Sequence, residues 1–357
     1  MLPTGAPEQV CAVVKASVEV SDGRDWSVVP ALSVNGTNII VTGRWPRTAH
    51  IHDEQWLERK AETPESWIGA LRAEQSAALR ADIFTFGQIL PATSPKYSYR
   101  TDMESIAAVR TASFHDWWEK LPQVSRKNVR RSQKRGVEVM VKPLDDNLVA
   151  DIVELNKDSP VRQGKKFVHY GKTFEQTKKD QMPHLERSDF ICAYSGRELV
   201  GLLKIVYANG TASILTFLPK TSQYDKRPAN ALIAKAVEIC EQRGVSHLIY
   251  GKFRYGKKNQ SSLLEFKQRN GFEEFLVPRY YVPLTAWGAF CLRLNLHRGL
   301  IGLLPSGVIR AGVSLRSVWG SIATPQGRCS SMLEQPNRLR QMERSIPPAG
   351  SNQDQEA

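Results

Sequence analysis

The chain has 357 residues, of which 41% are hydrophobic, so it can hold two domains with buried cores and a tail. Its 49 lysine and arginine residues exceed the 36 aspartate and glutamate residues. The resulting charge of +13 favours anionic partners such as CoA phosphates, nucleic acid or acidic lipid. Five scattered cysteines without CxxC spacing argue against a disulfide framework or a zinc site, and no signal peptide or membrane span is recognisable. We therefore expect a cytoplasmic protein with free thiols.

The first part of the chain predicts an α/β region over residues 26–136, after a weakly patterned N-terminus of residues 1–25. Strands are expected at Trp26–Val34 and Thr37–Thr42, around an Asn-Gly turn that is typical of a hairpin. Five more elements follow: a helix from Pro64 to about Arg80, strands Asp82–Gln88 and Ile106–Thr111, and helices Phe114–Leu121 and Val124–Arg135.

The order of elements is clearer over residues 137–285. We expect strand Val137–Val141, helices Asn147–Asn156 and Phe174–Met182, strands Asp189–Tyr194, Glu198–Val206 and Thr211–Leu218, helix Arg227–Arg243, strand Ser246–Tyr250, a helix opened by the capping box Ser262–Glu265, and strand Glu274–Val282. The fold class is α/β (α+β), a mixed sheet flanked by helices. No internal repeat is detectable in the sequence.

The C-terminal part differs in composition. No acidic residue lies between Phe275 and Leu333, and residues 286–322 form a basic, leucine-rich extension. The segment Leu292–Leu304 suits a helix at the surface of an anionic membrane, so peripheral contact at the inner face of the membrane is one hypothesis. The alternative is that it packs back on the preceding domain. Residues 323–357 are rich in Gln, Ser, Pro and Arg, which predicts a disordered tail.

Two short motifs carry a resemblance to a known family. Tyr250-Gly251-Lys252 ends a predicted strand, and Phe266-Lys267 lies on the next helix, just before Gly271-Phe272. With the preceding element order, this stretch resembles the C-terminal half of a GNAT acyltransferase, specifically the Fem-type (FemAB-like) branch. The resemblance covers about residues 106–285 well and 26–101 loosely. It implies a partial GNAT-like half over residues 26–136 and a complete one over 137–285.

The resemblance also implies roles for these residues. Phe266 and Lys267 would line the acceptor cleft, and Lys267 would stabilise the oxyanion formed during acyl transfer. Tyr250 and Lys252 would be its neighbours at the strand end. The alternative is a surface lysine beside a core phenylalanine.

A second candidate is the basic helix around Ser125–Val137. It carries six cations without a counter-ion of its own, and an anionic ligand would relieve their repulsion. The segment resembles the arginine-rich helix that joins the halves of Fem-type transferases, which implies that Arg126, Arg130 and Arg131 face the ligand. The alternative is a solvated helix between two domains.

The third candidate is the connection Asp158–Lys172, which lies between two predicted helices. His169 could act as a general base, because its pKa normally lies near neutrality. Arg162, Gln163 and Tyr170 are candidate substrate-binding residues. The alternative is that His169 and Tyr170 only pack the loop against the sheet.

The fourth candidate is the turn that leads into helix Arg227–Arg243. In GNAT enzymes this turn gives backbone N–H groups to the CoA pyrophosphate, and the cofactor-binding candidates here are Lys226, Arg227, Ala229, Asn230 and Ala231. The middle glycine of the family pattern is missing, and Pro228 removes one N–H donor. This departure leaves CoA binding open and suits a Fem-type enzyme that uses aminoacyl-tRNA.

No Ser-His-Asp set, HExxH, GxGxxG or GxxxxGK[ST] motif occurs in the chain. The resemblance implies an acyltransferase that moves an acyl or aminoacyl group from a thioester or ester donor to an amine or hydroxyl. Acyl-CoA is the expected donor, and no metal is expected. Two alternatives stay open: a Fem-type aminoacyl-tRNA-dependent transferase acting on a cell-envelope precursor, and a non-catalytic GNAT-like module that binds nucleic acid or a protein partner.

Overall fold

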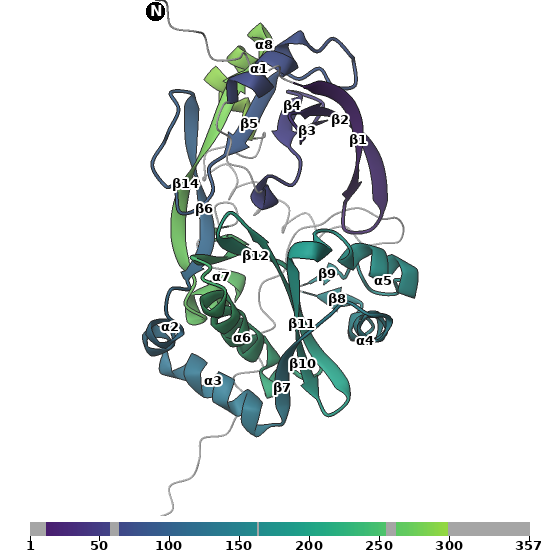
Figure 1. Ribbon diagram of the computed structural model, residues 1–357, viewed down its shortest axis with the longest axis vertical. Coiled ribbons are helices and arrows are strands. Elements are labelled where there is room, and N and C mark those ends of the chain that lie inside the picture. The colour runs from purple at the N-terminus through teal and green to yellow at the C-terminus, as the bar shows by residue number, and fades with distance from the viewer. Residues whose placement is uncertain (1–11, 58–63, 163, 255–261, 299–357) are drawn as a thin grey trace, which may run out of the picture.

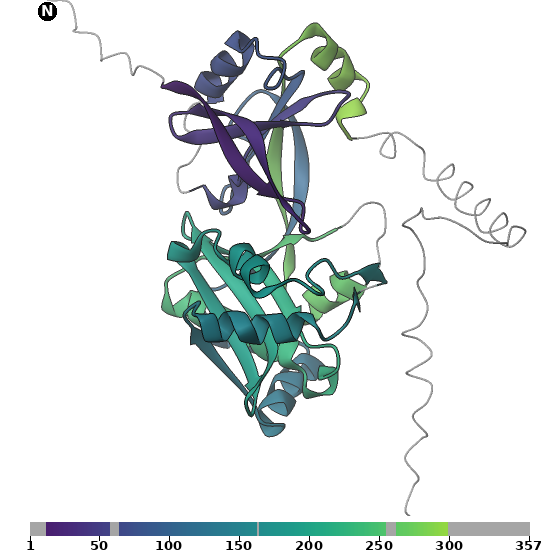
Figure 2. The ribbon, with the colours of Figure 1, turned by 90° about the vertical axis from the view of Figure 1, so that its right-hand side faces the viewer.

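The computed structural model describes residues 12–57, 64–162, 164–254 and 262–298, which form two lobes joined by one mixed sheet (Figures 1 and 2). The strands are β1 Val13–Ser21, β2 Trp26–Val34, β3 Thr37–Thr42, β4 Thr48–Ile51, β5 Ile83–Gly87, β6 Arg100–Arg110, β7 Val137–Lys142, β8 Val161–Arg162, β9 Lys165–Lys166, β10 Ser188–Ser195, β11 Glu198–Ala208, β12 Thr211–Pro219, β13 His247–Lys252 and β14 Glu273–Pro283. The α-helices are α1 Pro64–Ala73, α2 Phe114–Lys120, α3 Gln123–Lys134, α4 Asp146–Asn156, α5 Phe174–Gln181, α6 Pro228–Gln242, α7 Ser262–Arg269 and α8 Ala286–Arg293. Short 3₁₀ turns are η1 Glu54–Trp56, η2 Leu185–Arg187, η3 Tyr224–Lys226 and η4 Leu296–Arg298.

The main sheet has the strand order β1-β2-β3-β4-β5-β14-β6-β13-β12-β11-β10-β7. Adjacent strands of this sheet are antiparallel except for two parallel pairs, β4 with β5 and β12 with β13. Each parallel pair is connected through one helix, α1 in the first lobe and α6 in the second. The two lobes therefore repeat one arrangement of strands and helix, and their division into a partial and a complete GNAT-like half stays a prediction.

The lobes exchange their last strands. Strand β6 follows β5 in the chain but pairs with β13 of the second lobe, and β14 follows β13 but pairs with β5 of the first lobe. The long strands β6 and β14 also pair with each other, so they span the junction seen in Figure 1.

Helices cover both faces of the sheet in the second lobe (Figure 2). Helix α6 presents an almost continuous apolar side to one face, where Leu232, Ile233 and Val237 are fully buried together with residues of α2 and α3. Helix α4 covers the opposite face through Leu148, Ile152 and other residues. The first lobe has its own core around Trp67, Phe84 and Phe86, the last two of which stack at 5.4 Å.

Several boundaries differ from the sequence-based prediction. The helix that begins at Pro64 ends at Ala73, because Glu74 then accepts a hydrogen bond from the backbone of Ser76 and starts a turn. Residues 13–21, for which no element was predicted, form strand β1, paired along its whole length with β2. Strand β6 begins at Arg100 rather than Ile106, because its polar first half pairs with β14.

The basic, leucine-rich extension begins with α8, which packs back on the first lobe. Gly288 lies so close to the backbone of Asp82 that a Cβ atom there would be 1.9 Å from its carbonyl oxygen. Trp287 contacts Trp45, and Cys291 and Leu292 are buried. The rest of Leu292–Leu304 beyond residue 298 and the tail of residues 323–357 lie outside the described residues. Within the described part of the chain, no helix combines the length and the apolar character needed to cross a membrane.

Candidate functional site

A cleft of about 760 Å³ lies between the two lobes. Its first-lobe wall comes from the β1–β2 hairpin and from the segment that links β4 to η1. Its second-lobe wall comes from the end of α5, from the turn before η2 and from β12. The polar lining residues include four histidines, His50, His52, His169 and His184, together with Glu19, Asp53, Glu54, Asp180 and Arg279. The cleft is large enough to hold a substrate, and burial lowers the pKa of His50 and His184 in its wall.

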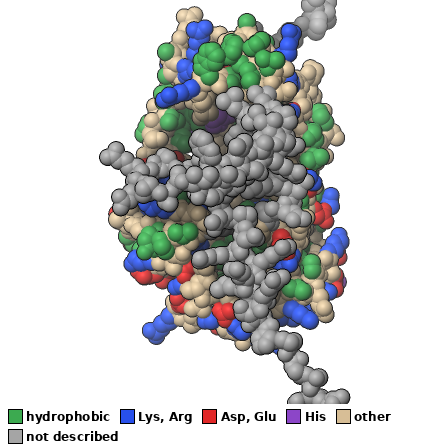
Figure 3. Space-filling view, turned by 180° about the vertical axis from the view of Figure 1, so that it is seen from behind, with side chains coloured by type: hydrophobic (Ala, Val, Ile, Leu, Met, Phe, Trp, Pro, Cys, Tyr) green, Lys and Arg blue, Asp and Glu red, His purple; other side chains and the backbone are tan. Residues whose placement is uncertain are grey.

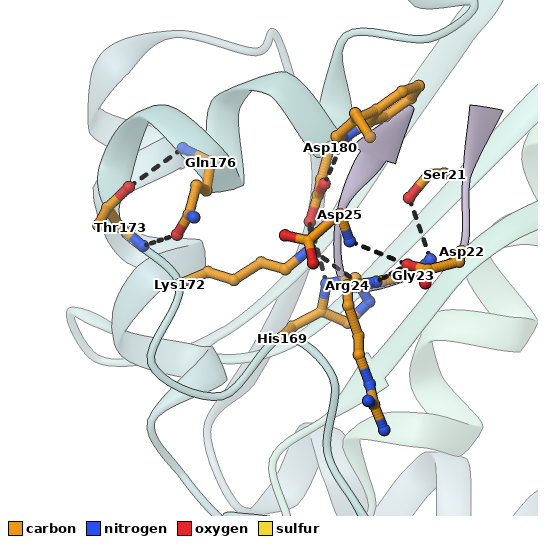
Figure 4. Close-up of polar contacts among 11 residues, drawn as sticks. Ser21, Asp22, Gly23, Arg24, Asp25, His169, Lys172, Thr173, Gln176 and Asp180 are labelled. Carbon is orange, nitrogen blue, oxygen red and sulfur yellow. Dashed lines mark hydrogen bonds and ion pairs between the residues drawn. The ribbon is translucent and has the colours of Figure 1, made fainter. Parts of the chain in front are cut away.

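His169 lines this cleft and is held by a carboxylate (Figure 4). Its Nδ1 lies 3.1 Å from Oδ2 of Asp180, and this oxygen also accepts a hydrogen bond from Nζ of Lys172 at 2.7 Å. The other oxygen, Oδ1, accepts from the indole of Trp26 at 3.0 Å. Burial alone would raise the pKa of Asp180, but the donors His169, Lys172 and Trp26 outweigh it and lower that pKa. An ionised carboxylate only accepts hydrogen bonds, so Nδ1 of His169 carries a proton, and Nε2 is the atom that bears the lone pair whenever the ring is neutral.

The rest of this network ties the two lobes together. Lys172 also donates to the backbone oxygen of Gly23 at 3.0 Å, so the tip of the β1–β2 hairpin is fixed to the loop that carries His169. Both Lys172 and Asp180 are more than nine-tenths buried at their side chains. Sequence reasoning missed Asp180 and Trp26 because they are 154 residues apart and neither stands in a motif.

The other candidates in the 158–172 connection lie elsewhere. The Arg162 guanidinium lies over Phe167 at 4.3 Å and donates to the backbone oxygen of Pro219 at 3.1 Å. Its Nε and Nη2 atoms are buried without a hydrogen-bond partner among the described residues, and this burial lowers the pKa of Arg162. Tyr170 is 44% exposed and does not line the cleft. Gln163 lies outside the described residues.

Lys267 is fully buried at the end of β13. Its Nζ donates to the backbone oxygens of Tyr250 and Lys252, at 2.7 Å each, and lies 4.4 Å from the centre of the Tyr250 ring. Burial lowers the pKa of Lys267 to about 8. The lysine therefore fixes the strand end where β12 and β13 stop pairing, since their last paired residues are Ser213 and Ile249. Its assignment as the oxyanion stabiliser stays a prediction.

Aromatic rings fill the space where β12 and β13 diverge. Phe217 of β12 contacts Tyr250 at 5.6 Å and Phe266 at 5.8 Å. Lys252, at the end of β13, forms an ion pair of 3.0 Å with Glu104 of β6. The structure thus brings Phe266, Lys267, Tyr250 and Lys252 together, but none of the four is among the residues that line the cleft beside His169.

The turn before α6 has an unusual start. Arg227 occupies the N-cap position in a left-handed conformation, with φ of 57°, and contributes no side-chain cap. Lys226 donates to Ser195 at 2.9 Å, and the Arg227 guanidinium lies over Tyr224. Ala229, Asn230 and Ala231 are buried, and the Asn230 amide bonds to Asn270. The first turn of α6 is therefore well packed, and CoA binding there stays a prediction.

Helix α3 exposes only part of its charge. Arg126 forms an ion pair of 2.6 Å with Glu119, Arg130 lies over the Trp118 ring at 5.6 Å, and Arg135 pairs with Asp225. Arg131 is exposed, as are Lys127 and Lys134. The helix packs against α6 through Val129, so it belongs to the surface of the second lobe. Seen from behind, basic and acidic side chains are mixed over the lower half of the molecule (Figure 3).

Arg279 of β14 is a feature of the cleft that the sequence motifs did not single out. It bonds to Glu54 and Glu104 at 2.8 Å each, which extends the Lys252–Glu104 pair across the sheet. Burial disfavours its charge, but the two glutamates raise the pKa of Arg279 above its ordinary value. Burial alone would raise the pKa of Glu104, but Arg279 and Lys252 lower it. One network thus joins the end of β13 to the cleft wall.

Comparisons with known proteins find similarity at the level of the fold. FemX is 10% identical with a TM-score of 0.48, over 74% of this chain and 88% of that protein. The structure of L-PGS from Bacillus licheniformis is 15% identical with a TM-score of 0.48, over 78% and 87% of the two chains. A tandem GNAT protein from the clavulanic acid biosynthesis pathway is 13% identical with a TM-score of 0.39, over 76% and 84%.

No protein-family model matches the chain, and no curated protein matches its sequence. The similarity to the Fem-type and GNAT structures is one of fold.

Proposed function

We propose that the protein is an acyl- or aminoacyltransferase whose acceptor, an amine or a hydroxyl, binds in the cleft between the lobes. The observation that carries the proposal is the hydrogen bond between His169 and Asp180 at the cleft wall. Nε2 of His169 would take the proton from the acceptor nucleophile as it attacks the donor carbonyl, and Asp180 would hold the ring and stabilise the imidazolium.

The donor would enter the cleft beside β12, whose residues Leu215 and Thr216 follow its last pair with β13 and line the cleft wall. Lys267 does not line the cleft, so in this proposal it fixes the end of β13 through the carbonyls of Tyr250 and Lys252, and its ammonium charge favours the tetrahedral intermediate from a distance. When the intermediate collapses, the bond to the donor thiolate or alkoxide breaks, and the proton on His169 can pass to that leaving group.

Acyl-CoA is the proposed donor, and charged tRNA is the second candidate. The packed start of α6, in which Pro228 has no N–H and the Asn230 N–H bonds to Arg227, favours the second candidate. So do the exposed cations of α3, because phosphate contacts dominate RNA affinity.

Thermal unfolding of the full chain with a panel of acyl-CoAs, and separately with aminoacylated tRNA, tests both donors. A ligand at about 100 times its Kd adds about 2.7 kcal/mol of stability, which raises the Tm by several degrees. A shift with one acyl-CoA supports the first donor. A shift only with charged tRNA that weakens steeply with salt supports the second, and no shift with either contradicts the proposal.

Helix α3 offers a matched pair of variants for the tRNA arm. Reversal of Lys127, Arg131 and Lys134 to Glu should abolish a tRNA-dependent shift and leave an acyl-CoA-dependent shift unchanged. Reversal of the exposed Lys165 and Lys166 in the β8–β9 hairpin, two reversals against three, lowers the charge at another surface and serves as the control. If both sets of reversals weaken tRNA binding equally, α3 is not its docking site.

A further inference from the structure

A second cavity of about 200 Å³ lies beside the cleft, in the first lobe. Its walls come from α1 and β5, from the segment after β4, from the loop that follows β5, and from the β11–β12 turn of the second lobe. The side chains that line it include Ile51, Leu57, Trp67, Phe86, Leu90 and Tyr97.

The walls of this chamber are largely apolar. Trp67, Phe86 and Leu90 are buried, at 7%, 1% and 2% exposure. The polar groups of the loop bond to one another, because the Gln88 amide donates to the backbone oxygens of Ala92 and Ser94 at 3.2 and 3.0 Å.

The same Gln88 side chain accepts from the Lys96 N–H at 3.0 Å and from the Tyr280 hydroxyl. The loop thus holds its shape through its own hydrogen bonds and turns apolar side chains toward the chamber. An apolar cavity of this kind favours an apolar ligand group over water.

The chamber adjoins the cleft through shared residues. Ile51 and Glu54 line both cavities. Glu54 is fixed at this boundary, since its two oxygens accept the Gly87 N–H at 2.5 Å and the Arg279 guanidinium at 2.8 Å. A ligand in the cleft therefore meets a fixed polar boundary with an apolar space beside it.

We infer that this chamber binds an aromatic ring or a branched aliphatic group of a ligand whose polar part lies in the cleft. The inference rests on the proposed function, because it assigns a hydrophobic substituent to the acceptor or acyl group bound there. Its size fits, since a cavity of about 150 Å³ lined by apolar side chains holds one benzene molecule. A larger polycyclic group would not fit without movement of the loop.

The test is calorimetric titration of the full chain with N-acetylphenylalanine amide, N-acetylleucine amide and N-acetylalanine amide. We expect the first two to bind about tenfold or more tightly than the third, because they bury a ring or a branched chain. Ala92 lines the chamber, and Ala92→Phe should remove this discrimination. Ala73→Phe, at the exposed end of α1, should retain it.

Equal binding of the three amides, or discrimination that persists in a folded Ala92→Phe variant, would overturn the inference. If Ala92→Phe does not fold, Leu90→Ala replaces it, since a larger chamber should shift the preference from the phenylalanine amide toward the naphthylalanine amide. If the preference does not shift in Leu90→Ala, the inference is also overturned.

The experiment distinguishes failure of the inferred chamber from failure of the proposed function, because ligand binding and acyl transfer are measured separately. If the protein discriminates among the amides but transfers no group from any donor, the result supports the chamber as a binding site and contradicts the proposed function. Transfer without discrimination would contradict the chamber alone.

Discussion

At the scale of single residues, His169 differs from the other histidines of the cleft in its partners. Asp180 and Lys172 define its position, and the carboxylate fixes the proton on Nδ1. We expect His169→Gln to keep a hydrogen bond to Asp180 but to lower kcat by about 10²–10⁴-fold, because the base is gone.

The measurement is the pH profile of kcat/KM with the donor identified by thermal unfolding. In His169→Gln the acidic limb of this pH profile, which reports protonation of the base, should vanish. The increase in Tm caused by the donor should remain. The exposed His115→Gln on α2 is the control and should keep the full profile. A His169→Gln enzyme with normal kcat would show that the histidine only ties the lobes together.

Two buried lysines make stability depend on pH. Burial lowers the pKa of Lys267 and of Lys204 to about 8, against about 10.4 in the unfolded chain. Between these values the unfolded state binds more protons, so the free energy of unfolding rises with pH from about 8 to 9. Above pH 9 the buried thiols Cys192 and Cys240, with pKa raised to about 12, oppose the rise.

Urea unfolding of the parent and of Lys267→Met at pH 7.5 and 9 measures this effect. The variant loses stability overall, because the backbone oxygens of Tyr250 and Lys252 lose their donor. Its stability should nevertheless rise less between the two pH values than that of the parent. An equal rise in both proteins would show that Lys267 titrates normally.

At the scale of elements, Arg279 connects β14, β6 and η1 through its two glutamate partners. Arg279→Met would leave Glu54 without its cation and Glu104 with Lys252 as its remaining cation. We expect a loss of about 2–3 kcal/mol, because removal of one partner from a buried ion pair costs more than the pair contributes. Urea denaturation measures the loss.

The matched control is Arg110→Met, which breaks the exposed pair with Glu273 at 67% and 61% exposure. Exposed ion pairs contribute at most about 1 kcal/mol, so this change should be small. Equal losses in the two variants would mean that Arg279 is not a structural link.

Helices and strands with a clear local signal, such as a hydrophobic period or a turn motif, were predictable from the sequence. Strands that form only by pairing with a distant strand were not. The apolar stripe of α6 and the Asn-Gly turn between β2 and β3 are local signals, and both elements begin within a residue of the prediction. The first half of β6, Arg100–Ser105, has a polar sequence and becomes a strand only because β14 lies beside it.

The candidate site residues were also predictable where they form a local motif, and not where they depend on distant parts of the chain. Phe266, Lys267 and Tyr250 come from a short motif, and the structure places them together. Asp180, the partner of His169, is 11 residues from it but stands in no motif. Trp26 of β2, which donates to the same carboxylate, is 154 residues from Asp180, so no spacing could have indicated it.

At the scale of the whole molecule, the exchange of β6 and β14 links the stability of the two lobes. Unfolding of either lobe would remove one of the two neighbours of a shared strand. We therefore expect one cooperative transition in calorimetry, with the calorimetric and van't Hoff enthalpies equal. Two resolved transitions would show that the lobes unfold independently despite the shared sheet.

The same exchange has a consequence for biosynthesis. Strand β5 emerges early from the ribosome, but its neighbour β14 is made only after the entire second lobe. At synthesis rates of roughly 5–20 residues per second, β5 waits about 10–40 s for that neighbour. During this interval the apolar strand Ile83–Gly87 has an open edge, which is the kind of surface that chaperones bind and that misassembles with a second nascent chain.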